Sequence, residues 1–210
     1  MARFEGDPIR SADLLAAYDA ILSRAAPGGD LEGEAAALRI EFERRTGAFR
    51  SEEAWFETRS RAFWDDALTT PTFADRAGAP LLGRAHRGLF VVDEVDRTGA
   101  VLRDLWSGVE LETQHLDEAQ ALAFEHAEGA FDARVLAFGS PPLLFALPGA
   151  YHHVPDALEP LGEILDAARE RDMSTTDVLD ALLRMDLVLR SSSRVKVSFA
   201  YRASGLSRPR

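Results

Sequence analysis

The most apolar part of the chain is an uncharged stretch at residues 135–155, which prolines and glycines interrupt. Its interruptions are Gly139, Pro141, Pro142, Pro148 and Gly149. The stretch is long enough to cross a bilayer, but a lipid-embedded helix with these breaks would leave backbone groups without hydrogen-bond partners. It therefore predicts two buried strands and tight turns at the centre of a soluble sheet, and no membrane insertion.

Short apolar runs and alternating apolar and polar residues surround this stretch, as in a β-meander. We expect strands at residues 89–92, 100–105, 109–113, 131–138 and 143–147. Turns at residues 96–99 and 106–108 join the first three, and a short helix over 117–127, closed by Gly129, precedes the fourth. About five strands make a sheet of ordinary size.

Three amphipathic helices are expected before the sheet. Ser11 caps the first, which stops at residues 27–29; the second ends near Gly47, and Ser51 caps the third. Each has one apolar face, so each needs a surface on which to pack.

After the sheet, helical periodicity returns over residues 156–171 and 174–190. Ser174 and Asp177 form a capping box for the second of these helices. Its apolar stripe continues to either Met185 or Val188. Beyond it, apolar side chains at positions 195, 197, 199 and 201 alternate with polar ones, as in a half-buried strand.

These elements predict an α+β fold: a small antiparallel β-meander or partly closed barrel with an N-terminal three-helix segment and a C-terminal helix pair packed on it. We expect an N-terminal helical segment at 1–75 and an antiparallel β segment at 80–154. A C-terminal helix pair with a basic strand follows at 155–202, all within one globular unit, and a flexible tail occupies 203–210.

Composition narrows the class of protein. The chain has 210 residues, 46% of them hydrophobic, which is enough to bury one domain core. It has no cysteine, so disulfides, thiolate metal sites and cysteine nucleophiles are excluded. Because residues 1–8 lack the pattern of a signal peptide, we expect a cytoplasmic protein.

Charge is unevenly distributed along the chain. The net charge is −11, yet residues 190–210 carry six basic residues and no acidic one, which leaves −17 on the first 189 residues. The acidic part opposes nucleic-acid binding. The basic segment supplies the candidate partner-binding residues Arg194, Lys196, Phe199, Tyr201 and Arg202. They could contact RNA or an anionic protein surface, or the segment could cover the acidic body of the same chain.

Residues 101–108 read Val-Leu-Arg-Asp-Leu-Trp-Ser-Gly, and residues 131–136 read Phe-Asp-Ala-Arg-Val-Leu. Together they resemble uncharacterised bacterial proteins related to SEC-C-motif-containing proteins, in which a strand reading L-x-D-L-x-x-G precedes a strand with an arginine. The resemblance covers roughly a quarter of the chain and implies a small β domain flanked by helices. The cysteines of the zinc motif are missing, so it implies no metal.

Candidate catalytic groups are few. Asp65 and Asp66 form a carboxylate pair at the end of the third expected helix, where acid–base work or cation binding is one interpretation. Compensation by Arg59, Arg61 or Arg76 is the favoured one. Nucleophile-elbow and phosphate-loop motifs are absent from the sequence.

The five histidines do not show a ligand spacing. His152 and His153 are neighbours on an expected strand end, so they point to opposite faces and cannot chelate one metal. His115 and His126 flank the expected short helix. We expect no metal site and no cofactor.

The helix pair could be read as a helix-turn-helix, but Asp177, Asp180 and Asp186 on its second helix would repel phosphate. The chain is therefore expected to be a non-catalytic cytoplasmic protein-interaction or regulatory adaptor. The alternatives are a nucleic-acid- or ribosome-associated protein using the basic C-terminal segment, and a hydrolase-like enzyme using Asp65 and Asp66.

Overall fold

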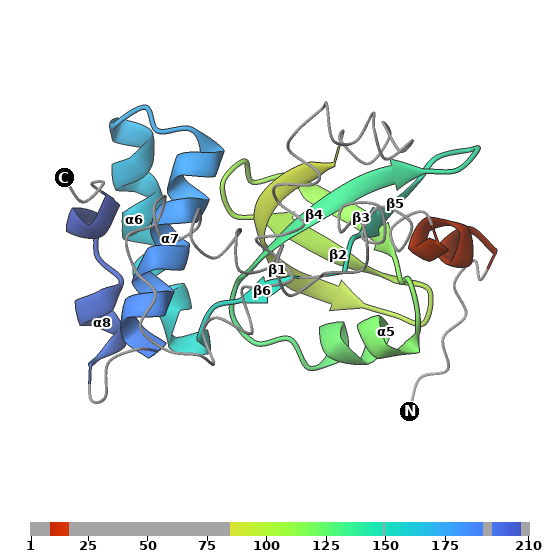
Figure 1. Cartoon of the computed structure of the whole chain (residues 1–210), viewed down its shortest axis with the longest axis horizontal. Coiled ribbons are helices and arrows are strands. Elements are labelled where there is room, and N and C mark those ends of the chain that lie inside the picture. Colours follow the sequence, from red (N-terminus) through yellow and green to blue (C-terminus); the bar gives the residue numbers. More distant parts are fainter. Residues whose placement is uncertain (1–8, 17–84, 149, 191–194, 207–210) are drawn as a thin grey trace, which may run out of the picture.

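The computed structural model describes residues 9–16, 85–148, 150–190 and 195–206. Strands and helices over these residues confirm the α+β class (Figure 1). The second and third helices expected in the N-terminal segment lie outside the described residues, together with Asp65 and Asp66. Arg194 and residues 207–210 also lie outside them.

Five strands form a closed barrel. They are β1 (His86–Val95), β2 (Gly99–Asp104), β3 (Glu110–Gln114), β4 (Phe131–Phe138) and β5 (Leu143–Ala146). The strand order is β1-β2-β3-β5-β4, and β4 pairs again with β1 to close the circle. A two-residue strand, β6 (Tyr151–His152), adds to β4. The expected strand positions are thus confirmed.

The sheet is mixed, so the prediction of an antiparallel sheet is wrong in one pairing. β3 and β5 run parallel, with Thr113 opposite Leu144 and Gln114 opposite Phe145. Every other pair of strands in the described sheet is antiparallel. The reason is the helix between β3 and β4, because it carries the chain across the barrel before the β4–β5 hairpin begins.

That helix, α5 (Glu118–Glu125), is the short helix expected before the fourth strand. Asp117 caps it, since its carboxylate accepts a hydrogen bond from the backbone N–H of Gln120 at 2.7 Å. Gly129 closes the connection with φ +77°, where a Cβ atom would lie 2.9 Å from Cα of Pro155. Phe124 of α5 is buried against the barrel interior.

The barrel interior is filled by buried side chains from α5 and four of the strands. They are Phe90, Ala100, Leu102, Phe124, Phe131, Ala133, Val135 and Ala146. Stacked and tilted phenylalanine rings run through it, with centroids 5.7–6.1 Å apart. The core of the β segment is therefore aromatic and continuous.

The C-terminal helices stand together beside the barrel (Figure 1). They are α6 (Leu158–Glu170), preceded by the 3₁₀ turn η2 (Pro155–Ala157), and α7 (Thr175–Arg190). Both confirm the expected helix pair. Ser174 Oγ accepts from the backbone N–H of Asp177 at 3.2 Å and donates to its carboxylate at 2.8 Å, as a cap should.

The basic strand expected near the C-terminus is wrong. Residues Val197–Ala200 form a short helix, α8, and Ala203–Leu206 form a second 3₁₀ turn, η3. Leu206 is buried, so the flexible tail expected from residue 203 does not begin there. A two-residue alternation over so few positions also fits one turn of helix with a single buried side.

A second core joins the barrel to these helices. Leu89 and Val91 of β1 point out of the barrel and pack on α6 and α7. The helix residues in the same apolar cluster include Leu161, Ile164, Leu165, Ala168, Val178, Leu179, Leu182 and Met185. Met185, not Val188, completes the α7 stripe, because Val188 is 41% exposed. The two predicted segments thus share an interior.

Residues 9–16 are helical and lie on the side of the barrel away from α6 and α7 (Figure 1). Ser11 does not cap this helix: it lies within it, and its Oγ donates to the carbonyl of His115 at 3.1 Å. Arg10 donates to the carbonyls of Ser140 and Pro141 at 3.1 and 2.7 Å. The segment is thereby held to the loops that follow β3 and β4. Among the described helices, none is long and apolar enough to cross a membrane.

Candidate binding surface

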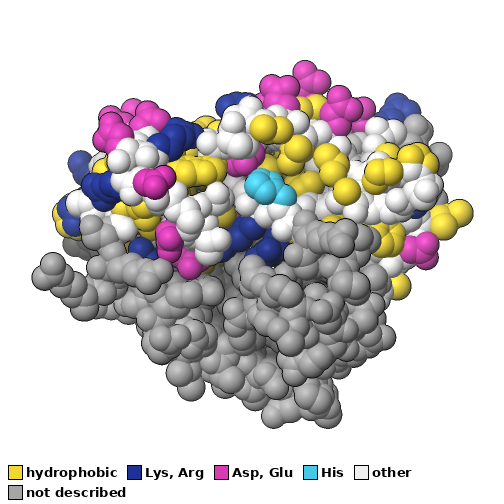
Figure 2. All heavy atoms as spheres, turned by 90° about the horizontal axis from the view of Figure 1, so that it is seen from above, with side chains coloured by type: hydrophobic (Ala, Val, Ile, Leu, Met, Phe, Trp, Pro, Cys, Tyr) yellow, Lys and Arg dark blue, Asp and Glu magenta, His cyan; other side chains and the backbone are white. Residues whose placement is uncertain are grey.

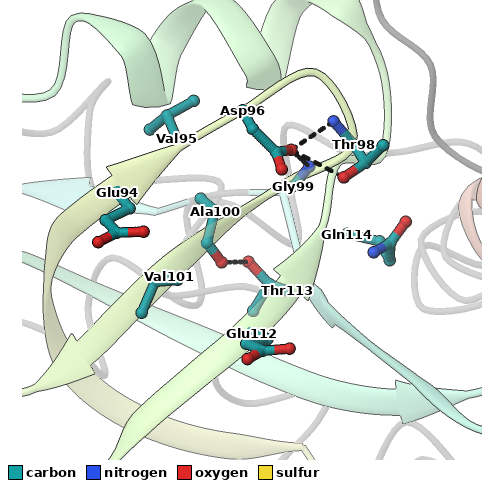
Figure 3. A pocket seen from close by; sticks show the side chains of 10 residues that line it. All are labelled: Glu94, Val95, Asp96, Thr98, Gly99, Ala100, Val101, Glu112, Thr113 and Gln114. Atoms are coloured by element: carbon teal, nitrogen blue, oxygen red, sulfur yellow. Dashed lines mark hydrogen bonds between the residues drawn. The ribbon is translucent and has the colours of Figure 1, made fainter.

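The outer face of strands β1, β2 and β3 carries a hollow of about 330 Å³, which we call the barrel hollow (Figure 3). Ala100 and Leu102 point into the barrel, so Val101 between them points outward. Val101 lies opposite Glu94 of β1 and Glu112 of β3. The residues around the hollow are Glu94, Val95, Asp96, Thr98, Gly99, Ala100, Val101, Glu112, Thr113 and Gln114.

Gly99 provides part of the floor of the barrel hollow. A Cβ atom at this position would lie 1.8 Å from the carbonyl oxygen of Thr113, so no side chain fits there. Gly99 pairs with Gln114, whose amide lies at the edge of the hollow (Figure 3). The backbones of β2 and β3 therefore lie in close contact at this position, and only glycine allows it.

Two carboxylates flank the hollow. Glu94 and Glu112 are exposed, and across the residues that the structure describes neither side chain makes a hydrogen bond or an ion pair. Since they stand on either side of β2, two strand spacings separate them, or about 10 Å between backbones. Their side chains are long enough to approach one group placed over Val101.

A third carboxylate, Asp96, is committed to the turn between β1 and β2. It accepts hydrogen bonds from Thr98 N–H, the Thr98 hydroxyl and Gly99 N–H at 2.6, 2.7 and 2.9 Å (Figure 3). The Thr98 hydroxyl and then the two backbone donors lower the pKa of Asp96. It remains ionised at neutral pH and adds negative charge beside the hollow.

Farther along the same face, Arg103 and Asp93 neutralise each other. A register shift in β1 between Val92 and Glu94 places Asp93 beside Arg103, which donates to both carboxylate oxygens at 2.7 and 2.9 Å. These hydrogen bonds lower the pKa of Asp93 and raise that of Arg103. The paired arginine therefore does not cancel the charges of Glu94 and Glu112.

The surface of the described β segment is acidic as a whole. Among the described residues of 86–154, nine acidic residues are exposed. Of the four arginines there, Arg87 and Arg134 have buried side chains, which leaves Arg97 and Arg103 at the surface. Figure 2 shows acidic side chains in several groups on one described face of the molecule, with hydrophobic side chains and some basic ones between them. This surface favours cationic ligands over phosphate.

The residues that carry the family resemblance build the barrel. Asp104 is fully buried and accepts from Trp106 N–H at 3.0 Å and from the Ser107 hydroxyl at 2.7 Å, which shapes the turn before β3. His86 Nε2 lies 3.3 Å from the same carboxylate, and Gly108 has φ +75°. The L-x-D-L-x-x-G pattern is therefore a hairpin signature here.

A buried polar cluster locks the C-terminal residues to the barrel. Asp186 of α7 accepts from the hydroxyls of Tyr151 and Tyr201 at 2.7 and 2.8 Å and from Arg190 Nε at 2.6 Å. His153 Nδ1 lies 2.8 Å from the Tyr201 oxygen. Since the Tyr201 proton goes to Asp186, His153 is the donor in that contact. Burial, followed by the Asp186 carboxylate, raises the pKa of Tyr201, so its hydroxyl stays neutral.

A second buried cluster crosses the same junction. Arg87 of β1 donates to Asp132 of β4 at 3.0 and 3.3 Å and to Asp180 of α7 at 3.3 Å. All three side chains are at most 10% exposed. Because these charges are shielded from water, loss of any one of them would leave a buried charge without its counter-charge. The cluster therefore has a structural role, since it fixes α7 against the barrel.

The candidate partner-binding residues of the C-terminal segment differ in how far they are exposed. Phe199 is 59% exposed, and the Arg202 guanidinium lies 4.6 Å from its ring centroid. Lys196 is exposed and lines a groove of about 850 Å³ formed by residues 155–156, 158–160 and 195–198. Tyr201 is 1% exposed and bonded to Asp186, so the described surface does not present it to a partner.

The histidines are dispersed. His152 is exposed and His153 is buried, which confirms that they face opposite ways. His115 is buried with Nε2 3.0 Å from the carbonyl of Asp96, and His126 is exposed at the end of α5. No metal-binding group of three or more histidine, aspartate or glutamate side chains occurs within the described ranges.

Sequence reasoning missed the barrel hollow. The alternation Glu110-Leu111-Glu112-Thr113 does place Glu110 and Glu112 on one strand face. The partner Glu94 was not found, because its position opposite Val101 depends on the register shift in β1. A scan against models of known families, a search of curated proteins and a search of solved structures each gave no match.

Proposed function

We propose that this chain is a non-catalytic protein-interaction module that binds its partner through the outer face of β1, β2 and β3. The supporting observation is the barrel hollow, where the carboxylates of Glu94 and Glu112 stand without partners in the described structure on either side of Val101. Uncompensated charges beside an apolar side chain offer an electrostatically complementary surface to a partner of opposite charge.

The topology supports this location. A five-stranded Greek-key barrel with a helix between its third and fourth strands resembles the OB-fold, in which strands 2 and 3 and the adjoining loops bind ligands. Many members of that fold bind oligonucleotides or oligosaccharides. Fold alone does not determine the ligand. The face here carries Glu94, Glu110 and Glu112, which would repel phosphate, so a protein partner is favoured.

The polar groups of the hollow favour binding over catalysis. The Thr113 hydroxyl is used within the sheet, since it donates to the carbonyl of Ala100 at 3.0 Å. Asp96 Oδ1 is engaged by three hydrogen bonds within its turn. Among the residues described around the hollow, there is no histidine or other base beside a nucleophile.

Site-specific photocrosslinking tests the proposal. A benzoylphenylalanine placed at Val101 is expected to give one discrete protein adduct in cells that produce the chain. The same group at Ala123, which is exposed on α5, is the matched control and is expected to give none. Equal adducts from both positions, or no adduct from Val101, would refute a binding role for this face.

A second candidate is contact with RNA or an anionic protein through the C-terminal surface of Lys196, Phe199 and Arg202. The exposed Phe199 ring with Arg202 stacked on it favours this alternative, because such pairs provide both apolar area and positive charge. Binding of an RNA oligonucleotide in a gel shift, lost in Phe199→Ala and Arg202→Ala, would support it. No shift at low salt would end it.

A further inference from the structure

We infer that the barrel hollow receives a lysine or arginine side chain from a basic, extended segment of the partner. This inference rests on the proposed function and specifies the chemistry of the partner. It commits to a cationic protein segment because an outer sheet face with uncompensated carboxylates is complementary to positive charge.

The hollow matches the two parts of such a side chain. Val101 offers an apolar surface on which an aliphatic stem can lie. Glu94 and Glu112 stand opposite Val101 on the two neighbouring strands, so a charged group placed over Val101 lies between them. The side-chain carbonyl of Gln114 is a further acceptor at the edge (Figure 3).

The surroundings add to the same preference. Asp96 stays ionised because its turn hydrogen bonds lower its pKa, and the positive charge of Arg103 is taken up by Asp93. A cation arriving at the hollow therefore meets a net negative field. Because these groups are exposed, the attraction should weaken with added salt.

The experiment uses the purified full chain and a fluorescent peptide of alternating glycine and lysine, with binding followed by fluorescence anisotropy. The double variant Glu94→Gln/Glu112→Gln is expected to weaken binding by roughly tenfold, about threefold for each exposed charge pair. The matched control, Glu118→Gln/Glu125→Gln on α5, removes the same charge elsewhere and should change affinity less than twofold. Circular dichroism confirms that each variant is folded.

A single variant tests occupancy of the hollow directly. Val101→Lys places an ammonium group at the centre of the hollow and is expected to abolish peptide binding. An acetylated peptide, which lacks the charge, should not bind to the unaltered chain.

Three results would overturn the inference: no binding of the lysine peptide at low salt, equal binding of the acetylated peptide, or an equal loss in the α5 control. A Val101 crosslink to a protein would leave the proposed function standing in each case. Conversely, specific peptide binding without any crosslinked protein in cells would count against the proposed function alone.

Discussion

Replacing Tyr201 by phenylalanine removes one oxygen atom from a position that is 1% exposed. That oxygen donates to Asp186 at 2.8 Å and accepts from His153 Nδ1 at 2.8 Å. The ring itself stays packed between α6, α7 and η3. The substitution therefore isolates the hydrogen bonds of the C-terminal lock from its apolar packing.

The expected cost follows from the partners that are left behind. A hydrogen bond to a charged group is worth about 1.5–3 kcal/mol, and a buried donor without an acceptor costs about 1–3 kcal/mol. Asp186 keeps Tyr151 and Arg190, which limits the loss on the carboxylate side. We expect the free energy of unfolding to fall by about 3 kcal/mol.

Urea unfolding followed by circular dichroism measures this change. The matched control is Tyr151→Phe, which removes one donor from an Asp186 oxygen that Arg190 also contacts. Its expected cost is smaller, about 1.5 kcal/mol. Hydrogen exchange in residues 195–206 should accelerate in the Tyr201 variant, since that segment loses its polar attachment.

A loss below about 0.5 kcal/mol for Tyr201→Phe would refute this account, because it would mean that apolar packing alone holds the segment. A larger loss for Tyr151→Phe than for Tyr201→Phe would contradict the assignment of His153 as the donor to Tyr201.

Three further predictions concern the barrel and its helices. Gly99→Ala should lower the free energy of unfolding by about 3 kcal/mol or more, because its Cβ would lie 1.8 Å from the Thr113 carbonyl oxygen. In the same urea assay Gly162→Ala on α6 is the control and should raise the free energy of unfolding by about 0.5–1 kcal/mol, because its added Cβ would meet no neighbouring atom within 4 Å. Arg87→Met should cost about 3–5 kcal/mol, since it leaves two buried carboxylates without that cation, and unaltered thermal stability would contradict the structural role of the cluster. Asp96 has a lowered pKa, so its contribution to stability is present above the unfolded value near 3.9 and is lost as pH falls through the folded pKa. Asp96→Asn should therefore be destabilised at neutral pH, and the difference from the original chain should shrink as the pH is lowered, which pH-dependent melting measures.

The positions of the strands follow from local patterns. Residues Phe131–Phe138 and the helix after Asp117 were predictable because apolar runs, a capping aspartate and Gly129 each act over a few residues. The β3–β5 pairing was not, because it joins Thr113 to Leu144 and depends on the path of the intervening helix. Local patterns do not specify which strands become neighbours.

In the C-terminal segment, local sequence pattern does not distinguish exposed aromatic residues from buried ones. Phe199 and Tyr201 look alike in the sequence, yet the first is 59% exposed and the second is 1% exposed. Their difference arises from Asp186 and His153, which lie 15 and 48 residues away from Tyr201. Candidate binding residues could therefore be proposed from charge and aromatic content, whereas their sorting required tertiary contacts.

Closure of the barrel has a consequence for biosynthesis. β1 obtains its second neighbour from β4, and β3 obtains its second neighbour from β5, which ends at Ala146. At about 5–20 residues per second, β5 leaves the ribosome roughly 3–10 s after β1. In the first part of that interval, before β4 emerges, Phe90 lacks the Phe131 ring against which it packs. The nascent chain should thus pass through a stage in which three strands expose their apolar residues, and chaperones have their main opportunity to bind at that stage.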